Sequence, residues 1–341
     1  MPEIINHVPN AQEATEWAAL RGSEQTAAVT APSLEELAGT FHQYLNEFSA
    51  APIYSAWEQY QSVEDPAKAT GIHEVLARGT YKGQELGLPE ASRSAADAAI
   101  DRVWFARMIN EKPETVDILA EKKVAGFHVS GSYALAGVLE GGKLLSGIAM
   151  EAEGLHTPTG QRDIGQAQSS ISFGTVPKLK RNFQSWNRTP NVTRTNEDVV
   201  ADLQGQIKEA EMNLQSAEQG SRAYYLYESG KKHAAGVLED FKKDPNSLRA
   251  TMLRHQFPVA FGVSRDFVRQ AEAQREGGRF FGVEDYGEFR PAAEAIPVEA
   301  LTVVAVPADK VASVTELLKH FGREHTAVVA FEDFQGDTIA A

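Results

Sequence analysis

The chain of 341 residues contains no cysteine. Without cysteine it can form no disulfide bond, no thiolate metal site and no cysteine nucleophile. It also has no apolar run of about 18 residues, the length that predicts a transmembrane helix. The opening stretch, MPEIINHVPNAQEATEW, lacks the basic and apolar regions of a secretory signal peptide. We therefore expect a cytoplasmic protein, or one delivered into a host cytosol, that does not act on membranes.

Acidic residues are missing from one segment of an otherwise acidic chain. The net charge of −14 disfavours coating of nucleic acid by the whole surface. Residues 164–196 nevertheless contain no aspartate or glutamate, and Phe183 and Trp186 alternate there with basic residues. The basic residues are Lys178, Lys180, Arg181, Arg188 and Arg194. Such a run is either a solvated loop face or a contact for an anionic substrate or cofactor.

Apolar periodicity changes near residue 120. Helical spacing predicts helices over 33–48, from Ser94 to about 110, and over 113–123. Beyond this point short β-prone segments appear at 124–130, 169–174, 257–264, 287–291, 300–307 and 326–334. Helices are expected between them at 199–220 and 230–244. The pattern predicts an α-helical accessory region over 1–120 and an α+β domain over 121–341.

The stretch GVLEGGK, residues 137–143, matches the spacing of a phosphate-binding P-loop. A P-loop needs a serine or threonine next, whose hydroxyl binds magnesium, but Leu144 stands there. Glu140 would also repel a phosphate group. We predict instead a short helix that ends at Gly141 or Gly142.

Other common catalytic motifs are absent, among them G-x-G-x-x-G after a strand, H-E-x-x-H and G-x-S-x-G. The histidines do not fall into a metal-ligand spacing, so no metal site is expected. One histidine stands out, because His128 lies within the apolar segment 124–130. A histidine in such a position is either a hydrogen-bonded structural residue or part of a site.

The order of the segments around His128 favours a site. The segment FHVS is followed by ALAGVLEGGKLLS, SISFG, FPVAFGV, GEFRP and IPVEALTVVAVP. Over residues 122–318 this series resembles the ADP-ribosyltransferase superfamily, in the branch with a histidine on its first strand. That branch includes diphtheria-toxin-like and poly-ADP-ribose-polymerase-like enzymes, and DNA-targeting toxins and RNA 2′-phosphotransferases open similarly. The resemblance implies a split β-sheet domain after the α-helical N-terminal region.

The resemblance also implies how NAD, as substrate, would be bound. His128 would hold the adenosine ribose, with Ser130 beside it. Ser170 and Ser172 would brace the nicotinamide ribose on the second strand. An aromatic side chain would stack on nicotinamide, and the candidates are Phe173, Tyr224, Tyr225 and Tyr227. The anion contacts, to the pyrophosphate or to a nucleic-acid acceptor, would come from Lys178, Lys180, Arg181 and Arg188.

The catalytic residue implied by the resemblance is Glu288, which opens a late strand. Its carboxylate would bond the ribose 2′-hydroxyl and stabilise the cation that forms as nicotinamide leaves. Glu294 and Glu299 are neighbouring alternatives. Tyr286 lies two residues before Glu288, where the arginine-modifying class has an acidic residue.

The expected function is mono-ADP-ribosyl transfer from NAD to a macromolecular acceptor, protein or nucleic acid, by a toxin-like or effector-like enzyme. Val129 follows His128 where the family usually has glycine. This substitution leaves open a non-catalytic binding module on the same fold. An RNA 2′-phosphotransferase-like enzyme and a structural or virion-associated protein are further alternatives, and the oligomeric state is open.

Overall fold

The computed structural model describes residues 79–81, 84–85, 89–106, 109, 112–156, 171–174, 189–273, 288–291 and 293–334. The helix expected over 33–48 lies outside these residues. The chain divides into two units, Met1–Lys123 and Val124–Ala341, at a boundary close to the residue 120 expected from the sequence.

The described part of the first unit contains two helices and a small strand pair. Strands β1 (Thr80–Tyr81) and β2 (Gln84–Glu85) pair antiparallel, an element that the sequence did not predict. Helix α5 (Glu90–Ala106) begins before the expected Ser94. Helix α6 (Pro113–Glu121) starts with proline in its first turn, as predicted, because the first turn does not need the missing N–H.

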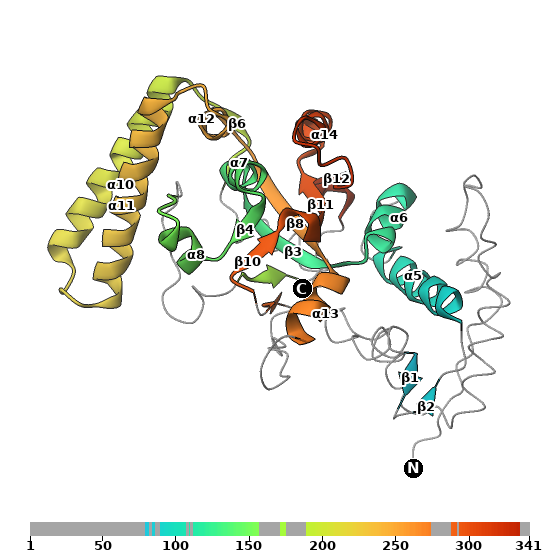
Figure 1. The fold of residues 1–341 in the computed structure, drawn as a ribbon. Helices are drawn as coiled ribbons and strands as arrows, with labels where there is room; N and C mark the ends of the chain where they lie inside the picture. Colours follow the sequence, from blue (N-terminus) through green and yellow to red (C-terminus); the bar gives the residue numbers. More distant parts are fainter. Residues whose placement is uncertain are drawn as a thin grey trace, which may run out of the picture. The chain divides into compact units, whose positions relative to one another are not determined.

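A six-stranded sheet organises the second unit (Figure 1). Its strand order is β12-β11-β8-β3-β5-β9, with β11 and β12 parallel and all other neighbours antiparallel. The strands are β3 (Val124–Gly131), β5 (Phe173–Gly174), β8 (Pro258–Ser264), β9 (Glu288–Phe289), β11 (Leu301–Val306) and β12 (Ala327–Ala330). The mixed sheet with helices confirms the predicted α+β class.

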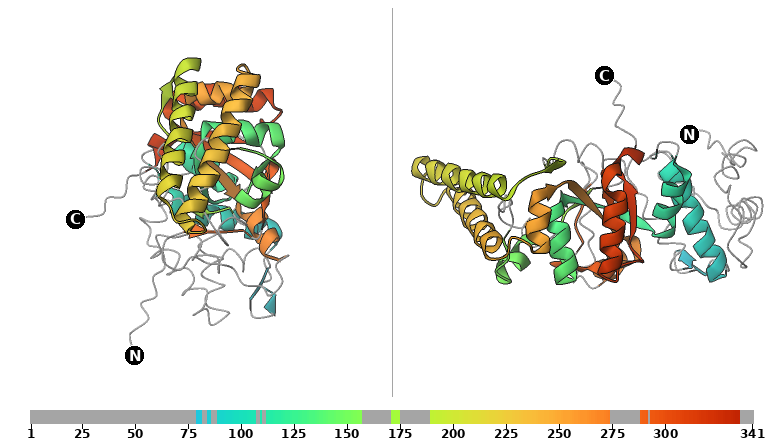
Figure 2. Two further views of the ribbon diagram at one scale, coloured as in Figure 1. Left: turned by 90° about the vertical axis from the view of Figure 1, so that its left-hand side faces the viewer. Right: turned by 90° about the horizontal axis from the view of Figure 1, so that it is seen from above.

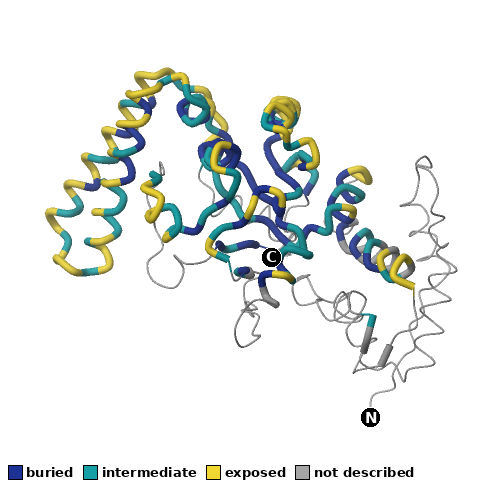
Figure 3. Tube along the Cα trace, in the orientation of Figure 1, coloured by how far each residue is buried: buried dark blue, intermediate teal, exposed yellow. Residues whose placement is uncertain are grey.

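The centre of the sheet is apolar because β8 and β11 are buried along almost their whole length. The ring of Phe127 on β3 meets that of Phe334 edge to face, with centroids 5.7 Å apart. Around the sheet lie α13 (Arg265–Ala273), α14 (Val311–His320) and the 3-10 turns η3 (Val298–Ala300), η4 (Ala308–Lys310) and η5 (Phe331–Asp333). Figure 3 shows the central strands in the colour of buried residues.

The segment that mimics a P-loop forms a helix, as predicted. Helix α7 (Ser132–Gly141) follows β3 directly, and Gly142 ends it in the left-handed conformation with φ 69°. The chain continues into β4 (Lys143–Leu145) and α8 (Gly147–Ala152). Strand β4 pairs with β10 (Ala295–Pro297), which ties the chain after β9 to the end of α7.

Along the chain, two long helices are inserted between β5 and β8, and they form a hairpin that extends away from the sheet (Figures 1 and 2). Helix α10 (Asn196–Ser216) starts with a capping box between Thr195 and Asp198. Helix α11 (Arg222–Lys243) begins well before the expected residue 230, because Ser221 caps its N-terminus. Strand β6 (Val192–Thr193), strand β7 (His255–Gln256) and helix α12 (Leu248–Arg254) join the hairpin to the sheet.

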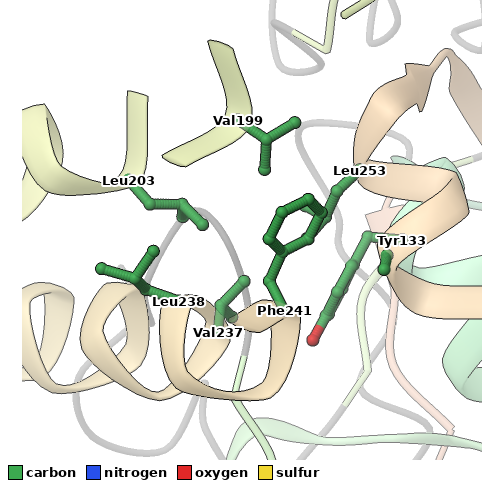
Figure 4. Packing of buried hydrophobic residues seen from close by; sticks show 8 residues of the cluster. Tyr133, Val199, Leu203, Val237, Leu238, Phe241 and Leu253 are labelled. Carbon is green, nitrogen blue, oxygen red and sulfur yellow. The ribbon is translucent and has the colours of Figure 1, made fainter. Parts of the chain in front are cut away.

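The base of the hairpin packs in a compact apolar cluster (Figure 4). The cluster contains Tyr133 of α7, Val199, Leu203, Val237, Leu238 and Phe241 of the hairpin, and Ala250 and Leu253 of α12. Towards the other end the residues are mostly exposed or half-buried, as Figure 3 shows. In the described part of the chain, no helix combines the length and the apolar composition that crossing a bilayer requires.

Candidate functional site

Three of the segments that carry the family resemblance lie on adjacent strands. His128 is on β3, Ser172 comes directly before β5, Phe173 is the first residue of β5, and Glu288 opens β9. The sheet places these strands in the order β3-β5-β9, at the edge opposite β12. Residues that are far apart in the sequence are therefore neighbours across this half of the sheet.

His128 is held by the neighbouring strand segment. Its Nδ1 atom is 2.9 Å from the main-chain oxygen of Ser172, and its ring lies 5.9 Å from that of Phe173. A carbonyl oxygen only accepts hydrogen bonds, so Nδ1 carries the proton and donates it. Burial lowers the pKa of His128 below its ordinary value, while the hydrogen bond to Ser172 acts in the opposite direction. The ring is thus a neutral imidazole at pH 7, with the lone pair of Nε2 available as an acceptor.

The strand register decides which face each residue of β3 shares. His128 pairs with Phe261 and Val129 with Ala260 of β8, in a regular antiparallel ladder. Because side chains alternate along a strand, the Val129 side chain points to the face opposite that of His128. The extra bulk of Val129 therefore lies on the other side of the sheet from the imidazole.

The register of Glu288 is offset from that of His128. Phe127 pairs with Gly174 across β3 and β5, and Gly174 pairs with Glu288 across β5 and β9. Glu288 therefore occupies the same cross-strand row as Phe127. By the alternation that separates Val129 from His128, this row belongs to the face of the sheet opposite that of His128. Glu294 is an exposed residue between β9 and β10.

Glu299, the other alternative, already has a partner on the same unit. Its Oε1 atom accepts a hydrogen bond of 2.7 Å from Arg323. Its own backbone N–H and then Arg323 lower the pKa of this carboxyl, so the pair is an ordinary exposed ion pair. This arrangement favours a structural role for Glu299.

The tyrosines proposed for stacking are not brought to His128. Tyr224 and Tyr225 belong to the first turn of α11, and Tyr227 follows one turn on. That turn lies at the end of the hairpin away from the sheet (Figure 1). Among the aromatic candidates, Phe173 is the one that packs beside His128.

All four predicted anion contacts lie outside the described residues. These are Lys178, Lys180, Arg181 and Arg188, and Ser170 is outside them too. The ends of the basic segment are described, however. Gly174 pairs with Phe127, and the Thr189 side chain lies so close to Gly131 that a Cβ atom at Gly131 would be 2.9 Å from its Oγ1. Both flanks of residues 175–188 therefore contact β3, the strand of His128.

Arg194, at the end of the basic segment, is used within the fold. Its guanidinium donates to Asp202 at 2.8 Å and to the main-chain oxygen of Leu253 at 2.9 Å. These bonds tie α10 to α12, so this arginine does not serve as a free anion contact. Among the described residues, no group of three or more histidine, aspartate or glutamate side chains is placed to hold a metal ion.

The sequence did not predict a pair of histidines that lie in contact away from His128. His156, after α8, meets His233 of α11 with ring centroids 5.6 Å apart. The sequence signal for this pair is Gly236. Glycine is unfavourable inside a helix, so its presence can indicate that another side chain packs against the helix backbone there.

Comparison of the chain with protein-family models, with curated proteins and with solved structures finds no match.

Proposed function

We propose that the β3-β5-β9 half of the sheet binds NAD and that the protein transfers ADP-ribose to a macromolecular acceptor. The proposal rests on one observation above all. The three segments that resemble the family's histidine, serine and glutamate strands are neighbours in this sheet, in that order. Nothing in the sequence spacing alone requires this, since residues 128, 172 and 288 are far apart along the chain.

The protonation state of His128 supports a role in binding a ribose. With Nδ1 donating to Ser172, the Nε2 atom can accept a hydrogen bond from a ligand hydroxyl. A neutral ring also adds no positive charge near the positively charged nicotinamide of NAD. Val129 does not oppose this role, because its side chain alternates to the other face and leaves the β3 main chain beside His128 uncovered by it.

The reaction breaks the bond between C1′ of the ribose and N1 of nicotinamide, and nicotinamide leaves as a neutral base. Positive charge develops on the ribose in the transition state, and a fixed carboxylate stabilises it preferentially. The family resemblance assigns this role to Glu288. A nucleophilic atom of the acceptor then bonds to C1′. Its proton passes to a general base, a role that the same carboxylate can take.

A non-catalytic binding module on the same fold is the second candidate. The observation that favours it is the register, which puts Glu288 in the row of Phe127 and not in that of His128. On this alternative NAD, or a related nucleotide, would bind at His128 without being cleaved.

The experiment is to incubate the full chain with NAD labelled in its adenylate part, together with a cell lysate. For transfer, we expect label on a macromolecule, with a loss of about 10²–10³-fold in Glu288→Gln, the cost of removing one electrostatic stabiliser. His128→Gln should weaken NAD binding. Glu316→Gln is the matched control, an exposed carboxylate on α14 that should keep full transfer.

The remaining outcomes separate the alternatives. Free ADP-ribose without labelled macromolecule would indicate a glycohydrolase. NAD binding without consumption would support the binding module. If the wild-type chain neither binds nor consumes NAD, the proposal fails, and a 2′-phosphorylated RNA becomes the next substrate to test.

A further inference from the structure

The ring of His156 is seated directly on helix α11. A Cβ atom built at Gly236 would collide with Cγ, Cδ2 and Nε2 of His156, so the ring occupies the place of the missing side chain. Glycine inside a helix costs about 1 kcal/mol relative to alanine. Because Gly236 has no side chain, the His156 ring fits against the helix at this position. A larger residue at position 236 would displace the ring.

A second residue of α11 also contacts this ring. His233, one turn before Gly236 on α11, packs edge to face against His156. The side chain of His233 is buried, and Nδ1 of His156 is buried without a hydrogen-bond partner among the described residues. The two imidazoles therefore meet in a place largely removed from water.

The charged groups around the pair come from both elements. Lys232 of α11 and Glu151 of α8 approach to 3.5 Å and are both exposed. Lys143 and Glu153 form a second ion pair, at 2.5 Å, beside the end of α8. Burial, then His156, then Lys232 lower the pKa of His233, and Glu151 acts in the opposite direction. The surroundings thus favour the neutral form of this ring.

We infer that the His156 ring, seated on Gly236 and against His233, is a latch that fastens the end of α8 to α11 and opens on acidification. At neutral pH the lowered pKa of His233 keeps its ring uncharged, and it packs edge to face against the His156 ring. Protonating His233 would place a cation in its buried position, against the His156 ring and next to Lys232, which electrostatics opposes. The ring of His156 then leaves its seat, and one attachment of the hairpin is lost.

The latch is separate from the apolar cluster at the base of the hairpin. His156 is the last described residue before segment 157–170, which leads along the chain to Ser172, the partner of His128. The apolar cluster at the base of the hairpin does not depend on the latch, since it is built from other residues. Opening therefore removes the His156 contact between the end of α8 and α11 without unfolding the hairpin, and the Lys232–Glu151 ion pair is the contact that remains described between these helices.

The absence of cysteine allows a direct test with introduced labels. Nitroxide labels at Ile148→Cys on α8 and Glu239→Cys on α11 occupy exposed positions. We expect a narrow distance distribution at about pH 8. At about pH 5.5, where imidazoles become charged, the distribution should broaden and its main distance shift by roughly 5 Å, the spacing of two packed rings.

Variants on the same helix sharpen the test. Gly236→Ala should give the broad distribution at both pH values, because its methyl group displaces the ring. Gly230→Ala is the matched control on the same helix, where a Cβ atom meets nothing within 4 Å, and it should behave like wild type. The double variant His156→Gln, His233→Gln should lose the pH response.

A second label pair distinguishes opening from unfolding. Labels at Gln204→Cys and Glu239→Cys report on the hairpin itself and should keep one distance at both pH values. Two results would overturn the latch: equal α8–α11 distributions at both pH values in wild type, or Gly236→Ala indistinguishable from Gly230→Ala. Loss of the hairpin distance at low pH would equally refute it, because the change would then be unfolding.

Discussion

His128 donates its Nδ1 proton to the main-chain oxygen of Ser172, at 2.9 Å, across the junction of β3 and β5. The bond fixes the tautomer of the imidazole and joins two of the strands on which the proposed function rests. The burial and the hydrogen bond that set the pKa of His128 exist only in the folded sheet, so the pKa of this side chain changes on unfolding.

The first prediction is a pH dependence of stability. Burial lowers the pKa of His128 in the folded state below its ordinary value of 6.5. Below pH 6.5 the unfolded chain therefore binds more protons at this site, and stability falls as the pH drops towards the folded-state pKa. Urea unfolding at several pH values should show this loss, with a shallower slope in His128→Gln. His233 contributes in the same direction, so the slope should decrease without vanishing. Equal slopes in the two proteins would contradict the prediction.

The second prediction concerns the centre of the sheet. A Cβ atom at Gly262 of β8 would lie 3.0 Å from Cε1 of Phe127 and 3.1 Å from Cβ of Val303. Gly262→Ala should therefore destabilise the protein by about 1–3 kcal/mol through overpacking. Gly205→Ala is the matched control in α10, where a Cβ atom meets nothing within 4 Å. It should gain about 0.5–1 kcal/mol, because alanine favours a helix more than glycine does. Thermal unfolding of both variants measures the difference, and a neutral Gly262→Ala would refute the packing at this position.

Local signals explain what the sequence predicts well. The end of α7 at Gly142 follows from a pair of glycines after a helical apolar pattern. Strand β8 follows from a short apolar run that is buried on both faces. Such features depend on neighbours along the chain, so they can be predicted without knowing the tertiary structure.

Features that depend on tertiary pairing were predicted less completely. A strand was expected over 169–174, but within the described residues only Phe173 and Gly174 form β5. The acceptor for His128 is a main-chain oxygen, which has no side-chain signature in the sequence. The start of α11 was placed too late, because the aromatic run around Tyr225 favours a strand locally, and packing against α10 overrides that preference.

The third prediction separates a helix cap from a phosphate loop. Gly142 has a φ of 69°, a conformation that costs a residue with a Cβ atom about 1–2 kcal/mol. Gly142→Ala should lower the free energy of unfolding by that amount. Gly141→Ala is the control one residue earlier, because Gly141 is the last helical residue and a Cβ atom there meets nothing within 4 Å. It should be neutral or slightly stabilising. Chemical denaturation gives both values, and equal losses in the two variants would contradict the cap.

The last prediction concerns the N-terminus of α10. The Oγ1 atom of Thr195 accepts a hydrogen bond from the N–H of Asp198, and the Asp198 carboxylate accepts one from the N–H of Thr195. Because the main-chain N–H of Asp198 loses its acceptor, Thr195→Ala should cost about 1 kcal/mol, the usual value for an N-cap. Ser216→Ala, at the exposed C-terminal end of the same helix, should change stability much less. Hydrogen exchange should locate the effect, with faster exchange in the first turn of α10 in Thr195→Ala alone. Faster exchange at the far end of the hairpin, with no change in the first turn of α10, would contradict the prediction.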